Sequence, residues 1–73
     1  MNEREFNDTL GAFLRSERKK HNLTLVEMAQ KLHISKSAVS YYENGRGVPV
    51  YVLVEYARFF GYSIDDIFNR LHV

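Results

Sequence analysis

The chain has 73 residues, of which 45% are hydrophobic and 26% charged, and its formal net charge is +1. This length predicts a single domain over 1–73, and a chain this short buries only roughly 60% of its unfolded surface. It has no cysteine, which excludes disulfides and thiolate metal sites, and no apolar run approaches the ~20 residues that cross a bilayer.

The first predicted helix runs from about Asn7 to His21. Spacings of three and four place one stripe of residues on the side that we expect to face the core: Phe6, Leu10, Phe13, Leu14 and Glu17. Gly11 interrupts this stripe, which indicates close packing against another helix. Asn22 is a residue type that tolerates the left-handed conformation, so we expect the helix to end before it.

The middle of the chain predicts two short helices joined by a turn of about three residues. The first spans Leu25–Leu32, because Thr24 and Glu27 form a capping-box pattern ahead of a buried stripe of Met28, Ala29 and Leu32. The second begins after Ser35, a favourable N-cap, and ends near Asn44. Two helices joined so tightly are typical of a helix-turn-helix motif, here at about 24–44.

Two further helices are predicted in the last third of the chain. One spans Val50–Phe60 and is stopped by Gly61. The other follows the capping pattern of Ser63 and Asp66 and runs to about Leu71. Strand patterns are weak throughout, so the sequence predicts an all-α fold of five helices in a compact bundle.

The helix after Ser35 has two distinct faces. At 100° per residue, one continuous arc is polar and contains Lys36, Ser37, Ser40, Tyr41 and Asn44. The opposite arc is apolar and contains Ala38, Val39 and Tyr42, with Glu43 at the border. Short hydroxyl and amide side chains with one lysine suit the base edges of a DNA major groove. The alternative is an ordinary solvated face, although such faces tend to be rich in Glu and Lys.

Charge is unevenly distributed along the chain. Residues 15–46 hold seven Lys or Arg and three acids, a balance of +4, whereas the remainder holds three bases and six acids, a balance of −3. A basic middle with acidic ends indicates a polyanionic partner on one face, and the alternative is a mixed, solvated surface.

The stretch at 23–46, LTLVEMAQKLHISKSAVSYYENGR, resembles the Cro/phage-repressor helix-turn-helix family, also called Xre-like. The resemblance extends from about Leu10 to Phe68 and includes the closing segment LVEYARFFGYSIDDIF. It implies a compact five-helix, lambda-repressor-like DNA-binding domain. Each piece alone is weakly specific, but all of them occur in order and at the family's spacing.

The resemblance also implies roles for particular residues. By position in the family's motif, four residues would contact bases: Lys36, Ser37, Ser40 and Tyr41. Four would contact phosphates, the first two together with their backbone amides: Thr24, Leu25, Asn44 and Arg46. Arg18 and Glu43 match a partly buried salt bridge of some family members, which would lock the first helix to the third.

Three residues depart from the family's pattern. Leu25 stands where the family often has Gln, so only backbone donors remain there for a phosphate. His33 stands where the turn usually has Gly, and positive φ is uncommon for a residue with a side chain. Tyr41 is large for a position that contacts bases, so the alternatives are a thymine methyl, a phosphate or simple packing on the helix surface.

The helix at 50–60 carries more apolar residues than one buried stripe needs. Its expected core arc is Val50, Leu53, Tyr56, Ala57 and Phe60. Val52 and Phe59 lie outside this arc, and the last helix adds Phe68 and Leu71. This apolar surplus predicts a homodimer through 50–73, with these four residues as interface candidates. The terminal Val73 would add to this surface. A two-fold dimer would match a pseudo-palindromic operator.

The predicted function is therefore sequence-specific binding of double-stranded DNA by a transcriptional regulator, in the first interpretation a repressor. The alternative is a protein-interaction module, such as an antitoxin or a dimerisation adaptor. Catalysis is not expected, because His21, His33 and His72 lack metal-ligand spacing and no Gly-rich phosphate loop is present, so we expect no cofactor and no metal. The charged N-terminal segment does not resemble a signal peptide, which favours a cytoplasmic protein, bacterial or phage-encoded, with no membrane partner.

Overall fold

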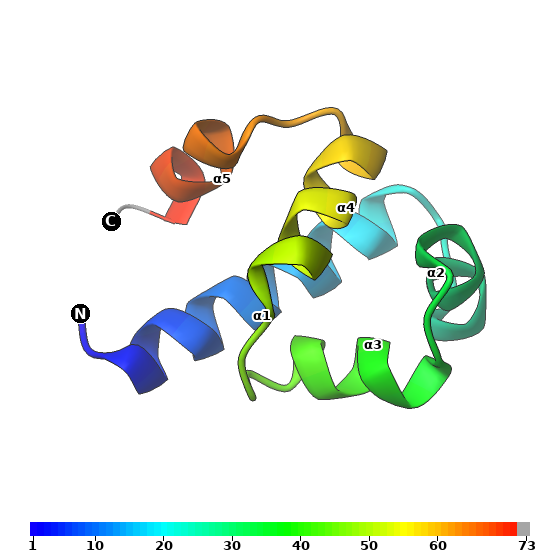
Figure 1. Cartoon of the computed structure of the whole chain (residues 1–73), viewed down its shortest axis with the longest axis horizontal. Helices are drawn as coiled ribbons and strands as arrows, with labels where there is room; N and C mark the ends of the chain where they lie inside the picture. The colour runs from blue at the N-terminus through cyan, green and yellow to red at the C-terminus, as the bar shows by residue number, and fades with distance from the viewer. Residues whose placement is uncertain (72–73) are drawn as a thin grey trace.

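In the computed structural model, which describes residues 1–71, five α-helices are joined by short turns (Figure 1). Their bounds are α1 (Glu3–Lys20), α2 (Leu25–Leu32), α3 (Lys36–Glu43), α4 (Val50–Phe60) and α5 (Ile64–Leu71). The predicted all-α fold with five helices is confirmed over these residues, while His72 and Val73 lie outside them. α3 packs on α1 and α2, α4 packs on α2 and α5, and α5 returns to α1.

α1 begins at Glu3 rather than at the predicted Asn7. The side chain of Asn2 accepts a hydrogen bond of 2.8 Å from the amide of Glu5, which caps the helix earlier than the apolar stripe indicates. Glu3 and Glu5 lie in the first turn, where negative charge is favourable, and three basic residues occupy the last turn. The predicted start considered only apolar spacing and missed this cap.

The caps of α2 and α3 are those that the sequence predicts. Thr24 Oγ1 accepts from the amide of Glu27 at 3.1 Å, and the Glu27 carboxylate accepts from the amide of Thr24 at 2.9 Å. Ser35 Oγ accepts from the amide of Ala38 at 3.0 Å. Between the two helices His33 adopts the left-handed conformation with φ 57°, so the turn keeps its geometry without glycine.

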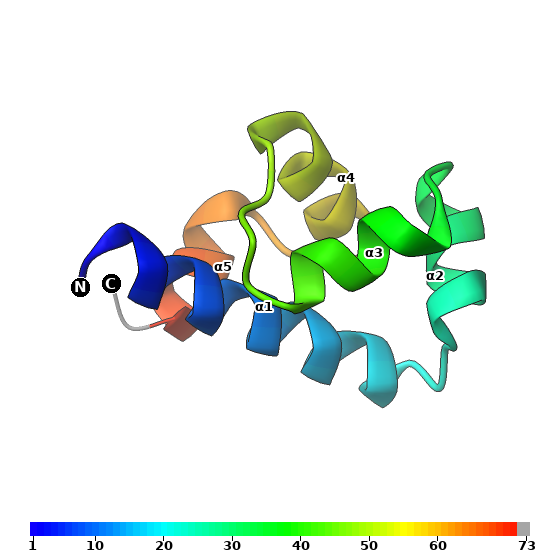
Figure 2. The ribbon, with the colours of Figure 1, turned by 90° about the horizontal axis from the view of Figure 1, so that it is seen from below.

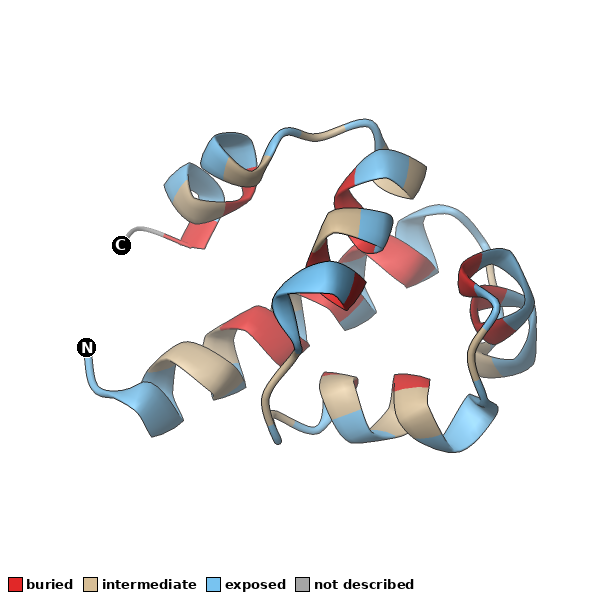
Figure 3. Ribbon diagram, in the orientation of Figure 1, coloured by how far each residue is buried: buried red, intermediate tan, exposed pale blue. Residues whose placement is uncertain are grey.

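The hydrophobic core draws on all five helices, whose buried sides face one another (Figure 3). Its buried members are Leu10, Leu14, Met28, Ala29, Leu32, Val39, Val52, Leu53, Tyr56, Ala57, Ile67 and Leu71. The stripes predicted for α2 and for most of α1 are therefore confirmed. Phe6 and Phe13 of α1 are partly buried and pack against this cluster.

Gly11 marks the closest approach of α1 and α3. A Cβ at this position would lie 2.7 Å from the carbonyl oxygen of Tyr42 and 2.8 Å from that of Glu43. Both neighbours are backbone atoms, so neither can swing aside as a flexible side chain would. The expectation of close helix packing at Gly11 is confirmed, and this contact fixes how α3 lies across α1.

The predicted orientation of α4 is partly wrong. Val50, expected in the core, is 76% exposed, because it begins the helix where the chain arrives from the loop after α3. Val52 and Leu71, expected at a dimer interface, are each 3% exposed and belong to the core of the chain itself. α4 packs between α2 and α5 and so buries a wider arc than one stripe, which takes in Val52. These two residues are therefore excluded as interface candidates.

Candidate nucleic-acid interface

The polar face of α3 is turned away from the bundle. Viewed from below, α3 lies on the near side of the molecule with no described helix in front of it (Figure 2). We call its outward residues the polar face: Lys36, Ser37, Ser40, Tyr41 and Asn44. Ser40 is half-buried and the other four are exposed, whereas Val39 on the opposite side is fully buried. The predicted division of this helix into two faces is confirmed.

An open hollow of about 640 Å³ runs along the polar face. It is lined by Leu25, Lys36, Ser37, Ser40, Tyr41, Asn44 and Arg46. These are seven of the eight residues that the sequence assigns to base or phosphate contacts, and Thr24 is the exception. The fold thus gathers residues from α2, α3 and the following loop on one surface.

Thr24, predicted to contact a phosphate, serves in the structure as the N-cap of α2. Its hydroxyl and its amide are both engaged with Glu27 in the capping box. Of the four first-turn amides that a helix leaves without intrahelical partners, those of Leu25 and Val26 therefore stay free to donate. The start of α2 offers these two donors beside the hollow, in a place where the helix dipole favours an anion.

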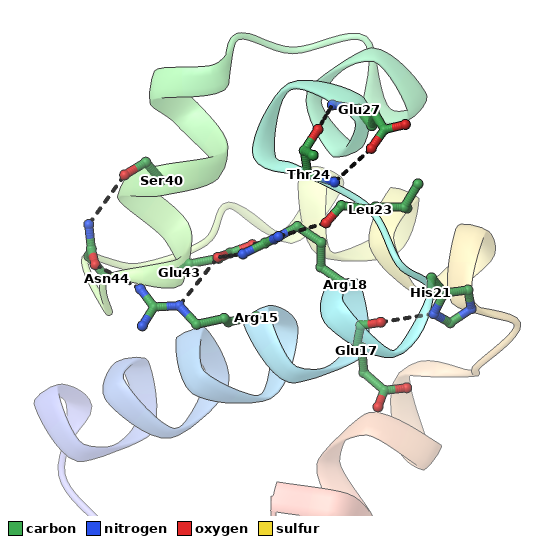
Figure 4. Close-up of polar contacts among 10 residues, drawn as sticks. All are labelled: Arg15, Glu17, Arg18, His21, Leu23, Thr24, Glu27, Ser40, Glu43 and Asn44. Atoms are coloured by element: carbon green, nitrogen blue, oxygen red, sulfur yellow. Dashed lines mark hydrogen bonds and ion pairs between the residues drawn. The ribbon is translucent and has the colours of Figure 1, made fainter.

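Two hydrogen bonds connect α1 to residues of the polar face (Figure 4). Arg15 Nη2 of α1 donates to Asn44 Oδ1 at 3.2 Å, and Asn44 Nδ2 donates to Ser40 Oγ at 3.4 Å. The site prediction missed Arg15. Its one signal in the sequence was its place in the basic stretch, three residues before Arg18.

Arg18 and Glu43 form the ion pair that the sequence predicts, and it is buried (Figure 4). Arg18 Nε donates to Glu43 Oε2 at 2.6 Å and Nη2 donates to Oε1 at 3.1 Å, while Nη1 donates to the carbonyl oxygen of Leu23 at 2.7 Å. The hydrogen bonds to Glu43 raise the pKa of Arg18 against the effect of burial. The pair connects α1, α3 and the approach to α2, and it fixes α3 on the bundle.

The charge exposed around the hollow is positive. Lys36 and Arg46 line it, and the side chain of Arg15, which contacts Asn44, is 47% exposed. Glu43, the one acid of α3, is turned inward and neutralised by Arg18. The arrangement suits a polyanion such as nucleic acid, because no carboxylate of α3 faces it.

A second polar cluster lies away from α3 and joins α1 to the chain after α4. Tyr62 Oη donates to the buried carboxylate of Glu17 at 2.5 Å, and Lys20 Nζ lies 3.0 Å from the same group. Burial acts to raise the pKa of Glu17, but Tyr62 and Lys20 outweigh it and the pKa is lowered.

The buried hydroxyl of Tyr56 has no hydrogen-bond partner, and burial raises its pKa.

Two other kinds of site receive no support from residues 1–71. No group of three or more His, Asp or Glu side chains in this part of the chain is placed to hold a metal ion. None of its helices has both the length and the apolar character needed to cross a membrane.

Comparisons with known proteins agree with this geometry. The sequence profile of the family described as Helix-turn-helix matches residues 14–67, most of the chain. The crystal structure of the clp gene regulator ClgR from C. glutamicum superposes with a TM-score of 0.77 at 30% identity, covering 90% of this chain and 87% of ClgR. No curated protein sequence matches the chain. The chain therefore belongs to the helix-turn-helix family of Cro/C1 (Xre) type, which comprises DNA-binding transcriptional regulators and not enzymes.

Proposed function

We propose that this regulator recognises a specific DNA sequence by inserting the polar face of α3 into the major groove. The groove is ≈ 12 Å wide and admits an α-helix, and each base pair presents a distinct set of donors and acceptors there. Lys36 suits guanine O6 and N7, and Ser37 and Ser40 suit either donors or acceptors. Tyr41, whose side chain is 52% exposed, is free to contact a thymine methyl. The open hollow that unites these residues carries the proposal.

Two groups of donors flank α3 and would bind the phosphates on either side of the groove. At one edge, the amides of Leu25 and Val26 offer hydrogen bonds at the start of α2. Near the end of α3, Asn44 and Arg46 supply an amide and a guanidinium. Arg15 holds Asn44 in place through its 3.2 Å hydrogen bond. Such contacts set the register of the protein on the duplex and leave sequence discrimination to the bases.

The regulator would act as a homodimer on a pseudo-palindromic operator, with half-sites about one turn (~34 Å) apart, because two-fold symmetry in the protein is matched in the DNA. Repression follows where such an operator overlaps a promoter. We place this activity in the cytoplasm, together with the DNA that it would bind.

A fluorescence-anisotropy titration tests the proposal. The chain is titrated into a random-sequence duplex, and into a duplex selected from a random library, each at low and moderate salt. Affinity should fall as salt rises, because neutralised phosphates release counterions, and the selected duplex should bind more tightly at both salt concentrations. Absence of binding at low salt would refute the proposal and would favour a protein-interaction module instead.

Two variants assign the binding to the polar face. Lys36→Ala should weaken binding to the selected duplex by about 1–3 kcal/mol, since it removes a direct contact to a base. Arg4→Ala is the matched control, because it removes the same charge from an exposed position in the first turn of α1. Equal losses in both variants would show that only overall charge matters.

A further inference from the structure

Arg15 of α1 reaches the polar face through the side chain of Asn44 (Figure 4). Its guanidinium donates from Nε to Glu43 Oε1 at 3.4 Å and from Nη2 to Asn44 Oδ1 at 3.2 Å. Glu43 is itself held by Arg18, so the guanidinium of Arg15 has a fixed neighbour. Asn44 and Ser40 line the open hollow and Arg15 does not. Arg15 is thus placed to act on the hollow through Asn44.

The contact with Arg15 determines which way round the amide of Asn44 lies. A guanidinium has five N–H donors and no acceptor, so the oxygen of Asn44 must face it. The amide nitrogen is then turned toward Ser40, whose Oγ lies 3.4 Å from Nδ2. An amide nitrogen donates and does not accept, so Ser40 Oγ is the acceptor in this hydrogen bond. Arg15 therefore sets the direction of both hydrogen bonds.

This direction leaves a proton available at Ser40. A serine hydroxyl has one proton and two lone pairs, and Asn44 occupies one of the lone pairs. Within residues 1–71 the hydroxyl donates its proton to no other group. Because Ser40 lines the hollow, an acceptor that enters the hollow can receive this proton. Asn44 uses one N–H of Nδ2 for Ser40 and keeps the other for a phosphate.

We propose that Arg15 is a positioning residue that makes Ser40 a hydrogen-bond donor toward the base it contacts. In the major groove the acceptors are N7 of purines, O6 of guanine and O4 of thymine. Without Arg15 the amide of Asn44 is free to turn over, and its oxygen then competes with the base for the proton of Ser40. The inference rests on the proposed function, since α3 must enter the groove to bring Ser40 to a base.

Duplexes with single altered atoms test the inference. Affinities are measured by fluorescence anisotropy for the selected duplex and for each of its single-base-pair variants. Ser40→Ala identifies the base pair that Ser40 contacts, because its preference should fall at that pair alone. Base analogues that each lack one acceptor are then placed at that pair: purines with CH in place of N7, guanine without O6 and thymine without O4.

Two further variants separate the role of Arg15 from that of its charge. Arg15→Met removes the donors and keeps a long, unbranched side chain. Lys19→Met is the matched control, because it removes the same charge from an exposed position one turn further along α1. Neither residue lines the open hollow, so a difference between the two variants does not come from a lost contact within it.

One of the analogues should weaken binding of the native protein and of Lys19→Met by about three- to tenfold, the value of one hydrogen bond. The same analogue should weaken binding of Ser40→Ala and of Arg15→Met by less than about twofold, because neither protein offers the base a committed proton. Arg15→Met should keep the native preferences at all other base pairs, whereas a loosened α3 would lower them at every pair.

Four results would overturn the inference. They are a Ser40→Ala protein with all the native base preferences, a native protein that no analogue affects, an Arg15→Met protein as sensitive to the analogue as Lys19→Met, and a loss in Arg15→Met that extends to every base pair. Failure of the proposed function looks different, because the native chain would then bind the selected duplex no more tightly than a random one.

Discussion

Both sides of α3 carry polar side chains, but those on the inner side are paired within the chain and those on the outer side are exposed. On the inner side, Glu43 is 5% exposed and its carboxylate oxygens accept from Arg18 at 2.6 and 3.1 Å. On the outer side, Lys36 and Ser37 are exposed and line an open hollow. The inner charges hold the helix in place, whereas the outer groups still have free hydrogen-bonding capacity.

Structural and binding residues here differ less in residue type than in whether their polar atoms already have hydrogen-bond partners within the chain. Arg18 donates three hydrogen bonds within the chain and has little left to offer a ligand. Arg46 is exposed and lines the open hollow along the polar face. Substitutions on the inner side should therefore change stability first, and those on the outer side should change DNA affinity alone.

The largest loss of stability is expected for Glu43→Ala. It leaves the Arg18 guanidinium buried without its partner, and breaking such a pair from one side costs about 3–5 kcal/mol. Urea denaturation followed by circular dichroism measures the loss. In the double variant Arg18→Met, Glu43→Met the stability should largely return, because no charge is then left buried. A double variant as unstable as Glu43→Ala would show that the loss does not come from the unpaired charge.

Gly11→Ala should come next, with a loss of about 1–3 kcal/mol from overpacking. The added Cβ would meet two carbonyl oxygens of α3 at 2.7 and 2.8 Å and the amide nitrogen of Gly45 at 2.9 Å, so α1 and α3 must move apart. Gly61→Ala is a useful contrast, because a Cβ there meets nothing within 4 Å and only the left-handed φ of 80° is strained. A Gly11→Ala protein as stable as the native chain would contradict the close contact.

The second polar cluster predicts a pH dependence. The pKa of Glu17 is lowered from its ordinary 4.5, so its ionised form stabilises the fold above about pH 4.5 and this contribution is lost as pH falls through the folded pKa. Glu17→Gln keeps an oxygen for Tyr62 but cannot titrate. Thermal melts between pH 3 and 6 should therefore show a shallower acid loss in Glu17→Gln. If the melting temperatures of the two proteins fell in parallel as pH is lowered, ionised Glu17 would not be the source of the pH dependence.

The smallest effect, and one of opposite sign, is expected for Tyr56→Phe. The hydroxyl of Tyr56 is buried without a partner, and an unpaired buried hydroxyl is unfavourable by about 1–3 kcal/mol. Its removal should raise stability by roughly 1 kcal/mol at most, because some of that penalty is relieved by small movements. A clear loss of stability in chemical denaturation would mean that the hydroxyl makes a favourable contact.

Local signals in the sequence predicted the helices well. Thr24 with Glu27, and Ser63 with Asp66, mark helix starts through short-range hydrogen bonds that the structure contains. His33, noted as a departure because the family's turn usually has Gly, adopts the left-handed conformation at that position. The start of α1 was missed, because the Asn2 cap lies outside the apolar stripe from which that helix was inferred.

Features that depend on packing between helices were harder to predict. Val52 appeared surplus on a helical wheel, but the wheel does not show that α4 packs between two other helices. Leu71 was added as an apolar residue of the last helix, and its burial depends on how α5 packs on α1 and α4. Arg15 was missed because its contact with Asn44 joins residues 29 apart, and no local pattern indicates it. The polar face itself was predictable, since nine consecutive residues suffice to define it.

The central claim is that the polar face of α3 meets DNA, and Ser37→Glu tests it most directly. A carboxylate in the first turn of α3 interacts favourably with the positive end of the helix dipole, so the protein should fold with equal or greater stability. The account predicts that it no longer binds the selected duplex in an anisotropy titration, whereas Ser16→Glu on the exposed side of α1 retains most of its affinity. Native affinity in a folded Ser37→Glu protein would contradict the account.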